Sequence, residues 1–147
     1  VRIASQAVRS PGGLIDKLLG DGIMALFIPG FVTDHDHAVG AVTAGREILR
    51  NVRLPVGVGI HAGPAWVGFV GGVDDVMDFT ALGDAVNVAS RLGSEAAAGQ
   101  LLLSDATAGA ARLQNDGLRP RRLELRGRSE PLDAWSEAVA PTPASAA

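Results

Sequence analysis

The stretch KLLGDGIMALF, residues 17–27, places a Gly-Asp-Gly triplet between two apolar runs. Two apolar runs joined by a short glycine-containing turn are typical of a β-hairpin. We therefore expect strands over residues 14–19 and 23–28, joined by a turn at residues 20–22. The hairpin commits this part of the chain to an antiparallel sheet and places Asp21 at a turn. Asp21 is then either an ordinary turn former or a carboxylate held at a strand junction for a chemical purpose.

The rest of the chain divides into segments with helical spacing and segments with extended character. Helices are expected over residues 1–9, 33–51, 84–98 and 105–114, and extended segments within residues 54–72, 75–83, 100–104 and 120–138. Thr33 and Asp36 have the spacing of a capping box at the start of the second helix. Because the two kinds of segment do not alternate strictly, we predict an α+β fold, an antiparallel sheet with helices on one face. It forms one domain over residues 1–139, and residues 140–147 are expected to be a disordered tail.

Composition narrows the functional classes. The chain has 147 residues and no cysteine, which excludes disulfides and thiolate metal sites. Its 13 basic and 16 acidic residues give a net charge of −3, which disfavours non-specific binding to nucleic acid. No apolar run approaches the ~20 residues that span a bilayer, and the first residues lack the apolar core of a signal peptide. We therefore expect a cytoplasmic protein without a membrane segment.

A second polar pattern lies in FTALGDAVNVASRL, residues 79–92. Asn87 and Arg91 are four residues apart on an expected helix, so their side chains share one face. An amide and a guanidinium near a helix N-terminus can bind one anionic group. An ordinary exposed polar stripe explains the same spacing, just as a solvated strand face explains Lys17. Spacing alone leaves both readings open.

The three stretches KLLGDGIMALF, VGVGIHAGPAWVGFVG and FTALGDAVNVASRL, in this order and together with LRGRSEPLDAW, resemble the class III nucleotidyl cyclase catalytic domain. The resemblance covers residues 1–139 and implies a ferredoxin-like fold. It implies formation of a 3′,5′-cyclic nucleotide and pyrophosphate from a nucleoside triphosphate. It also implies a head-to-tail homodimer, with active sites at the subunit interface and two divalent cations, Mg²⁺ or Mn²⁺, in each.

The resemblance also assigns roles to individual residues. Asp21 matches the second metal-binding aspartate of the family. Asn87 and Arg91 match the catalytic pair that orients the ribose and stabilises the transition-state phosphate, and they come from the other subunit. Arg126 falls where the family often has a lysine on the triphosphate, and Arg128 is the alternative if the alignment shifts.

Lys17 and Thr80 match the positions that read the purine. Lysine can only donate hydrogen bonds, so Lys17 suits the N1 acceptor of adenine, and the Thr80 hydroxyl can accept from the N6 amino group. Guanine presents the opposite pattern, a donor at N1 and an acceptor at O6. A hydroxyl can also donate, so Lys17 carries most of this preference. We therefore expect an adenylate cyclase that uses ATP.

One family feature has no match in the sequence. The first metal-binding aspartate belongs to a strand upstream of the second, yet the only acidic residue before Asp21 is Asp16, which adjoins Lys17 and does not fit the pattern. Either the sequence is a fragment of a longer cyclase, or it is a variant that lost this strand. In both cases one cation lacks a protein ligand, and we expect very low cyclase activity and open sheet edges. The alternatives are a non-catalytic cyclase-like domain for dimerisation or nucleotide sensing, and a binding module of no cyclase descent.

Two further features complete the expectations. The glycine-rich stretch is expected to form a hairpin arm that packs across the dimer, in which Trp66 and Phe69 face either the partner or the core.

His35 and His37, in the sequence DHDH, are two residues apart and point to different sides of a helix, so we interpret them as a polar helix start. His61, where the family often has histidine, is given no catalytic role.

Overall fold

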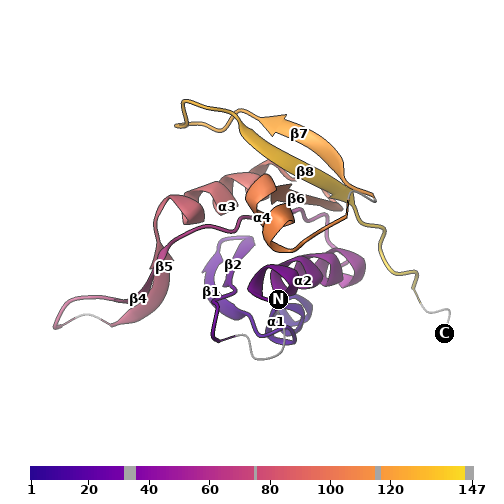
Figure 1. The fold of residues 1–147 in the computed structure, drawn as a ribbon. Coiled ribbons are helices and arrows are strands. Elements are labelled where there is room, and N and C mark those ends of the chain that lie inside the picture. The colour runs from indigo at the N-terminus through magenta and orange to yellow at the C-terminus, as the bar shows by residue number, and fades with distance from the viewer. Residues whose placement is uncertain (32–35, 75, 115–116, 145–147) are drawn as a thin grey trace.

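The computed structural model describes residues 1–31, 36–74, 76–114 and 117–144. Within them the helices are α1 (Arg2–Arg9), α2 (His37–Asn51), α3 (Asp84–Glu95) and α4 (Asp105–Ala110) (Figure 1). The strands are β1 (Leu14–Leu19), β2 (Gly22–Leu26), β3 (Val58–Ile60), β4 (Trp66–Val70), β5 (Asp78–Leu82), β6 (Gln100–Ser104), β7 (Arg119–Leu123) and β8 (Leu132–Ala138). Every predicted element is present, with ends shifted by a few residues. No helix in this part of the chain is long and apolar enough to cross a bilayer.

The strands form three separate groups. A four-stranded sheet has the order β3-β6-β8-β7, and the hairpins β1-β2 and β4-β5 stand apart from it. In the four-stranded sheet β3 pairs with β6 in parallel, and the other pairs are antiparallel. The predicted α+β class is confirmed, but the central sheet is mixed rather than purely antiparallel.

Helices cover both faces of the four-stranded sheet, whereas the sequence led us to expect them on one face. Leu101 and Leu103 of β6 share a core cluster with residues of α2, while Leu102 shares another with residues of α3. Neighbouring residues of a strand point to opposite faces, so α2 and α3 lie on opposite sides of β6. The uninterrupted apolar run of β6 is itself typical of a strand buried on both faces.

The β1-β2 hairpin has the predicted turn. Leu19 pairs with Gly22, which leaves Gly20 and Asp21 as the two loop residues. Gly20 has φ +60°, the conformation that glycine adopts at the first position of a tight hairpin loop. The register shifts between Ile15 and Lys17, so a β-bulge lies at Asp16.

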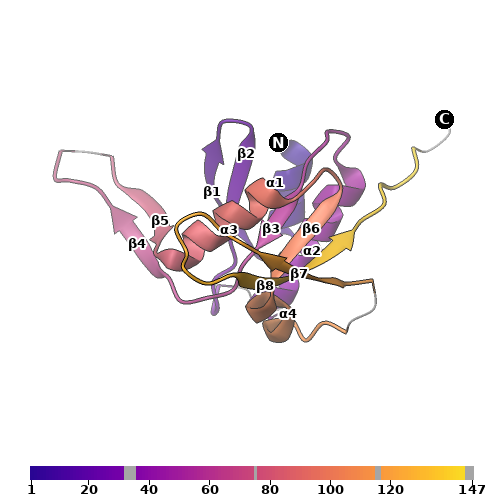
Figure 2. The ribbon, with the colours of Figure 1, turned by 90° about the horizontal axis from the view of Figure 1, so that it is seen from above.

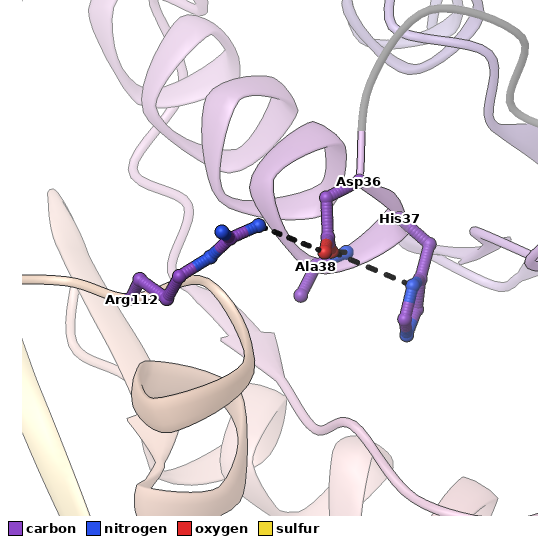
Figure 3. Close-up of polar contacts among 4 residues, drawn as sticks. All are labelled: Asp36, His37, Ala38 and Arg112. Atoms are coloured by element: carbon purple, nitrogen blue, oxygen red, sulfur yellow. Dashed lines mark hydrogen bonds and ion pairs between the residues drawn. The ribbon is translucent and has the colours of Figure 1, made fainter.

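Helix α2 begins later than predicted, and Asp36 is its N-cap. The Asp36 carboxylate accepts a hydrogen bond of 2.9 Å from the backbone amide of Ala38. It also lies 3.5 Å from His37 Nδ1 and from a guanidinium nitrogen of Arg112 (Figure 3). His37 thus stands at a polar helix start, whereas Thr33 and His35 are outside the described residues.

Helix α3 packs directly on the backbone of the segment that contains β3. A Cβ atom at Gly59 would lie 2.1 Å from the backbone nitrogen of Gly93, and one at Gly57 would lie 2.4 Å from the carbonyl oxygen of Ala96. Only glycine permits this approach. These two positions therefore fix the place of α3, which carries Asn87 and Arg91.

The segment after β8 runs back to the end of α2. Residues 140–144 form no helix or strand, and the Thr142 amide donates a hydrogen bond of 2.8 Å to the Arg50 carbonyl. Residues 145–147 lie outside the described part of the chain.

Candidate active site

The first part of the candidate site is the exposed face of α3. Val88 and Leu92 are buried against the sheet and anchor the helix. Asn87 is exposed and Arg91 is partly buried. The helix follows Gly83, whose φ of +135° favours glycine, and carries Asp84 in its first turn.

The loop between β7 and β8 lies against this face. Arg128 Nη1 is 2.6 Å from Asp84 Oδ2, so the loop is tied to the first turn of α3. A Cβ atom at Gly127 would lie 3.4 Å from Arg91 Nη2, which shows that the Arg91 guanidinium reaches the same loop. Arg126 is exposed in this loop. The structure therefore brings Arg91 together with the segment that holds Arg126 and Arg128, and Arg128 is the one paired with a carboxylate.

The second part of the candidate site is the junction between β1 and β5. Lys17 Nζ lies 3.6 Å from Asp78 Oδ2, and Thr80 Oγ1 donates a hydrogen bond of 2.8 Å to Asp16 Oδ2. Lys17 and Thr80, distant in sequence, therefore lie at one junction of two strands. Sequence reasoning paired Lys17 with Thr80 but missed Asp16 and Asp78.

Asp21 stands alone at the hairpin turn. It is exposed, and in the described ranges no group of three Asp, Glu, His or Cys side chains could hold a metal ion. One carboxylate suits Mg²⁺, which binds through one or two carboxylates together with substrate phosphates and water. The residues present fit one cation held jointly with a triphosphate, and they do not supply a two-metal cluster. Within one chain, no polar contact among the described residues joins Asp21 to Asn87 or Arg91.

His61 lies just after β3 and close to the start of α3. Its Nδ1 atom is 2.7 Å from Ser104 Oγ. Burial lowers the pKa of His61 below 6.5, and the Arg128 guanidinium lowers this pKa further, against an opposing effect of the Asp84 carboxylate. His61 is therefore a neutral imidazole at pH 7. Sequence reasoning noted His61 but could not find its partner, since Ser104 is 43 residues away.

The β4-β5 hairpin projects from the body of the chain in two perpendicular views (Figures 1 and 2). Trp66 is 53% exposed and Phe69 is 63% exposed. Phe69 packs edge-on against Phe79 of the paired strand, with ring centroids 5.3 Å apart. Trp66 and Phe69 were expected to face either the partner or the core, and the structure excludes a place in the core of a single chain.

Comparison with known proteins identifies the domain. A family model described as the adenylate and guanylate cyclase catalytic domain matches residues 32–135. An adenylate cyclase of Anabaena cylindrica is 39% identical over an alignment of 101 residues, and the match covers 59% of this chain and 19% of that protein. The terminal-differentiation specific adenylate cyclase of Dictyostelium discoideum is 36% identical over an alignment of 102 residues, and the match covers 60% of this chain and 4% of that protein. The chain thus spans a small part of the curated relatives that it matches.

Solved structures agree in fold. The guanylyl cyclase Cya2 superimposes with a TM-score of 0.78 at 28% identity, over 97% of this chain and 78% of that one. The adenylyl cyclase CyaB from P. aeruginosa superimposes with a TM-score of 0.72 at 30% identity, over 90% of this chain and 75% of that one. A binding module of no cyclase descent is thereby excluded. The chain belongs to the adenylate and guanylate cyclase catalytic domain family.

Proposed function

We propose that this chain is the catalytic domain of an adenylate cyclase, which converts ATP to 3′,5′-cyclic AMP and pyrophosphate in a homodimer. The observation that carries the choice of ATP is the junction of β1 and β5, which holds Lys17 and Thr80 beside each other. Both curated relatives named above are adenylate cyclases, although the similar solved structures include a guanylyl cyclase. The choice between ATP and GTP therefore depends on the residues at this junction.

The junction is complementary to adenine. Lys17 donates to the N1 acceptor, and Thr80 Oγ1 accepts from the N6 amino group. Guanine would place its N1–H donor against the Lys17 ammonium, so two donors would face each other without an acceptor. A buried mismatch of this kind can cost on the order of 10⁴-fold in discrimination.

The exposed face of α3 and the adjoining loop handle the sugar and the phosphates. The 3′-hydroxyl of ATP releases its proton to solvent and attacks the α-phosphorus, the bond from this phosphorus to the bridging oxygen breaks, and pyrophosphate leaves. Asn87 orients the ribose, and Arg91 stabilises the negative charge that spreads over the α-phosphate oxygens. Arg126 binds the part of the triphosphate that leaves as pyrophosphate. Its planar guanidinium can make a bidentate contact with this group, which a lysine ammonium could not make.

Asp21 is the residue that would hold a divalent cation, Mg²⁺ or Mn²⁺, together with the triphosphate. When bound, such a cation neutralises phosphate charge and lowers the pKa of the attacking hydroxyl. A complete site for phosphoryl chemistry of this kind uses two cations about 3.5–4 Å apart. Because the described residues offer one carboxylate at this place, we expect slow turnover by the chain itself.

The arm supplies the dimer contact. Exposed apolar side chains run along β4, β5 and the segment between them; they are Trp66, Phe69, Val70, Val73, Val76, Met77 and Leu82. So many exposed apolar side chains on one projecting hairpin support an interaction site there. A second copy of the chain would bury it, and would bring its own Asn87 and Arg91 to the Asp21 of the first.

A second candidate function is a cyclase-like domain that dimerises or senses nucleotide without turnover. The observation that favours it is the lone carboxylate of Asp21. Incubation of the purified chain with Mn²⁺ and ATP separates the two functions. Slow formation of cyclic AMP that is lost in Lys17→Ala supports the proposed enzyme. ATP binding without any formation of cyclic AMP supports the second candidate. Ser90→Ala, on the exposed surface of α3, is the control variant and should form cyclic AMP at the wild-type rate.

A further inference from the structure

A buried carboxylate lies behind the base-reading pair. Thr80 is 3% exposed and its hydroxyl is 2.8 Å from Asp16 Oδ2. The other oxygen, Asp16 Oδ1, is buried and has no hydrogen-bond partner in the described part of the chain. Leaving a buried acceptor unpaired is unfavourable, so the burial of Asp16 points to a role beyond folding.

The β-bulge explains how Asp16 reaches Thr80. Successive side chains of a regular strand point to opposite faces, so Asp16 and Lys17 would normally diverge. The register shift between Ile15 and Lys17 breaks this alternation. Both side chains consequently contact β5, Asp16 through Thr80 and Lys17 through Asp78.

The chemistry of Asp16 fixes the direction of one hydrogen bond. A carboxylate accepts hydrogen bonds and cannot donate them, so the single Thr80 hydroxyl proton points to Asp16. The Thr80 oxygen is then left with lone pairs only. Toward a ligand Thr80 is an acceptor, although an isolated threonine could play either part.

We infer that Asp16 is a specificity-determining positioning residue, which holds Thr80 as an obligatory acceptor and thereby selects a 6-amino purine over a 6-oxo purine. The inference rests on the proposed nucleotide site and goes beyond it, since it resolves the ambivalence of Thr80. The Lys17 donor and the Thr80 acceptor together complement N1 and N6 of adenine, and the Thr80 acceptor opposes O6 of guanine.

The test measures the dissociation constants of 3′-deoxy-ATP and 3′-deoxy-GTP, which cannot cyclise, for the purified chain with Mg²⁺. In Asp16→Asn the amide can donate to Thr80, so the hydroxyl is free to turn and donate to O6. The preference for the adenine nucleotide should fall by about tenfold, the size of one net hydrogen bond. Asp133→Asn, the same change at an exposed position of β8, should leave the preference unchanged.

A double-mutant cycle shows whether Asp16 acts through Thr80. In the Thr80→Val background, where the hydroxyl is absent, Asp16→Asn should have no further effect on the ratio of the two constants. An unchanged ratio in Asp16→Asn alone, or an equal change with and without the Thr80 hydroxyl, overturns the inference while the nucleotide site stands. A wild-type chain that binds neither nucleotide contradicts the proposed function itself, and the inference with it.

Discussion

His61 donates its Nδ1 proton to Ser104, because every other proton in their hydrogen-bond network is already committed. The Thr107 hydroxyl donates to the Ile60 carbonyl, so Ser104 must donate its own proton to Thr107 Oγ1. Ser104 Oγ, 2.7 Å from His61 Nδ1, is then an acceptor toward the imidazole. The neutral ring therefore carries its proton on Nδ1.

This network predicts a pH dependence of stability. Burial lowers the pKa of His61 below its usual 6.5, so the unfolded chain takes up a proton more readily than the folded one. The free energy of unfolding should therefore decrease as the pH falls below 6.5, until the folded pKa has been passed. Urea unfolding between pH 7.5 and pH 5 measures this decrease, which should be smaller in His61→Gln. Equal pH profiles of the two proteins would contradict the role of His61.

The close packing of α3 on the β3 segment predicts a large effect of one methyl group. Gly59→Ala places a Cβ atom 2.1 Å from the Gly93 nitrogen, and backbone cannot yield as a flexible side chain can. We expect a loss of about 1–3 kcal/mol or more in the free energy of unfolding. Gly109→Ala is the matched control, because it has open space around it in a helix and should gain about 0.5–1 kcal/mol. Comparable urea midpoints for the two variants would show that the contact is not tight.

The proposed catalytic pair, Asn87 and Arg91, predicts a loss of rate without a loss of fold. Asn87 and Arg91 lie on the exposed face of α3, so alanine at either position removes no core contact. Each change should lower the rate of cyclic AMP formation by roughly 10²- to 10³-fold, the usual effect of removing one donor that stabilises a developing anion. Thermal unfolding should be unchanged. A normal rate in Arg91→Ala would exclude Arg91 from the reaction.

The arm predicts the assembly state. Trp66→Ala removes a large exposed aromatic side chain from the surface that we assign to the dimer. We expect the dimer dissociation constant, measured by sedimentation equilibrium, to rise by at least about tenfold, as for other aromatic anchors. Leu54→Ala is the control, since Leu54 is also apolar and is 69% exposed but lies outside the arm. An equal effect of the two changes would argue against an arm-mediated dimer.

Local signals in the sequence predicted most of the fold. The turn residues Gly20 and Asp21 predicted the first hairpin, and Gly99, with φ +76°, follows the helix expected over residues 84–98 and lies directly before β6. The arrangement of helices on both faces of the sheet was not predicted. The same order of helices and strands along the chain is compatible with helices on one face or on both. The uninterrupted apolar run of β6 indicates a strand buried on both faces, but a run of three leucines is also compatible with a core on one face only.

The candidate site was predictable where the residues matched the motifs of the family. Lys17 and Thr80 were paired through the family resemblance, and the structure placed them at one junction. Asp16 was considered only as the missing metal-binding aspartate and did not fit that pattern, and the bulge that turns it toward Thr80 has no clear sequence signal. Asp84, which binds Arg128, was expected only as a helix start. An ion pair between residues that are far apart in the sequence produces no periodic pattern by which it could be predicted.

The most direct test of the central claim is a mixing experiment, because the proposed site takes Asp21 from one chain and Arg91 from the other. Asp21→Ala and Arg91→Ala should each form almost no cyclic AMP when assayed alone with Mn²⁺ and ATP. After mixing and exchange of subunits, half of the dimers carry one copy of each variant, and one of their two sites is intact, so about a quarter of the wild-type rate should return. A mixture no more active than the two separate variants would contradict a site shared between two chains.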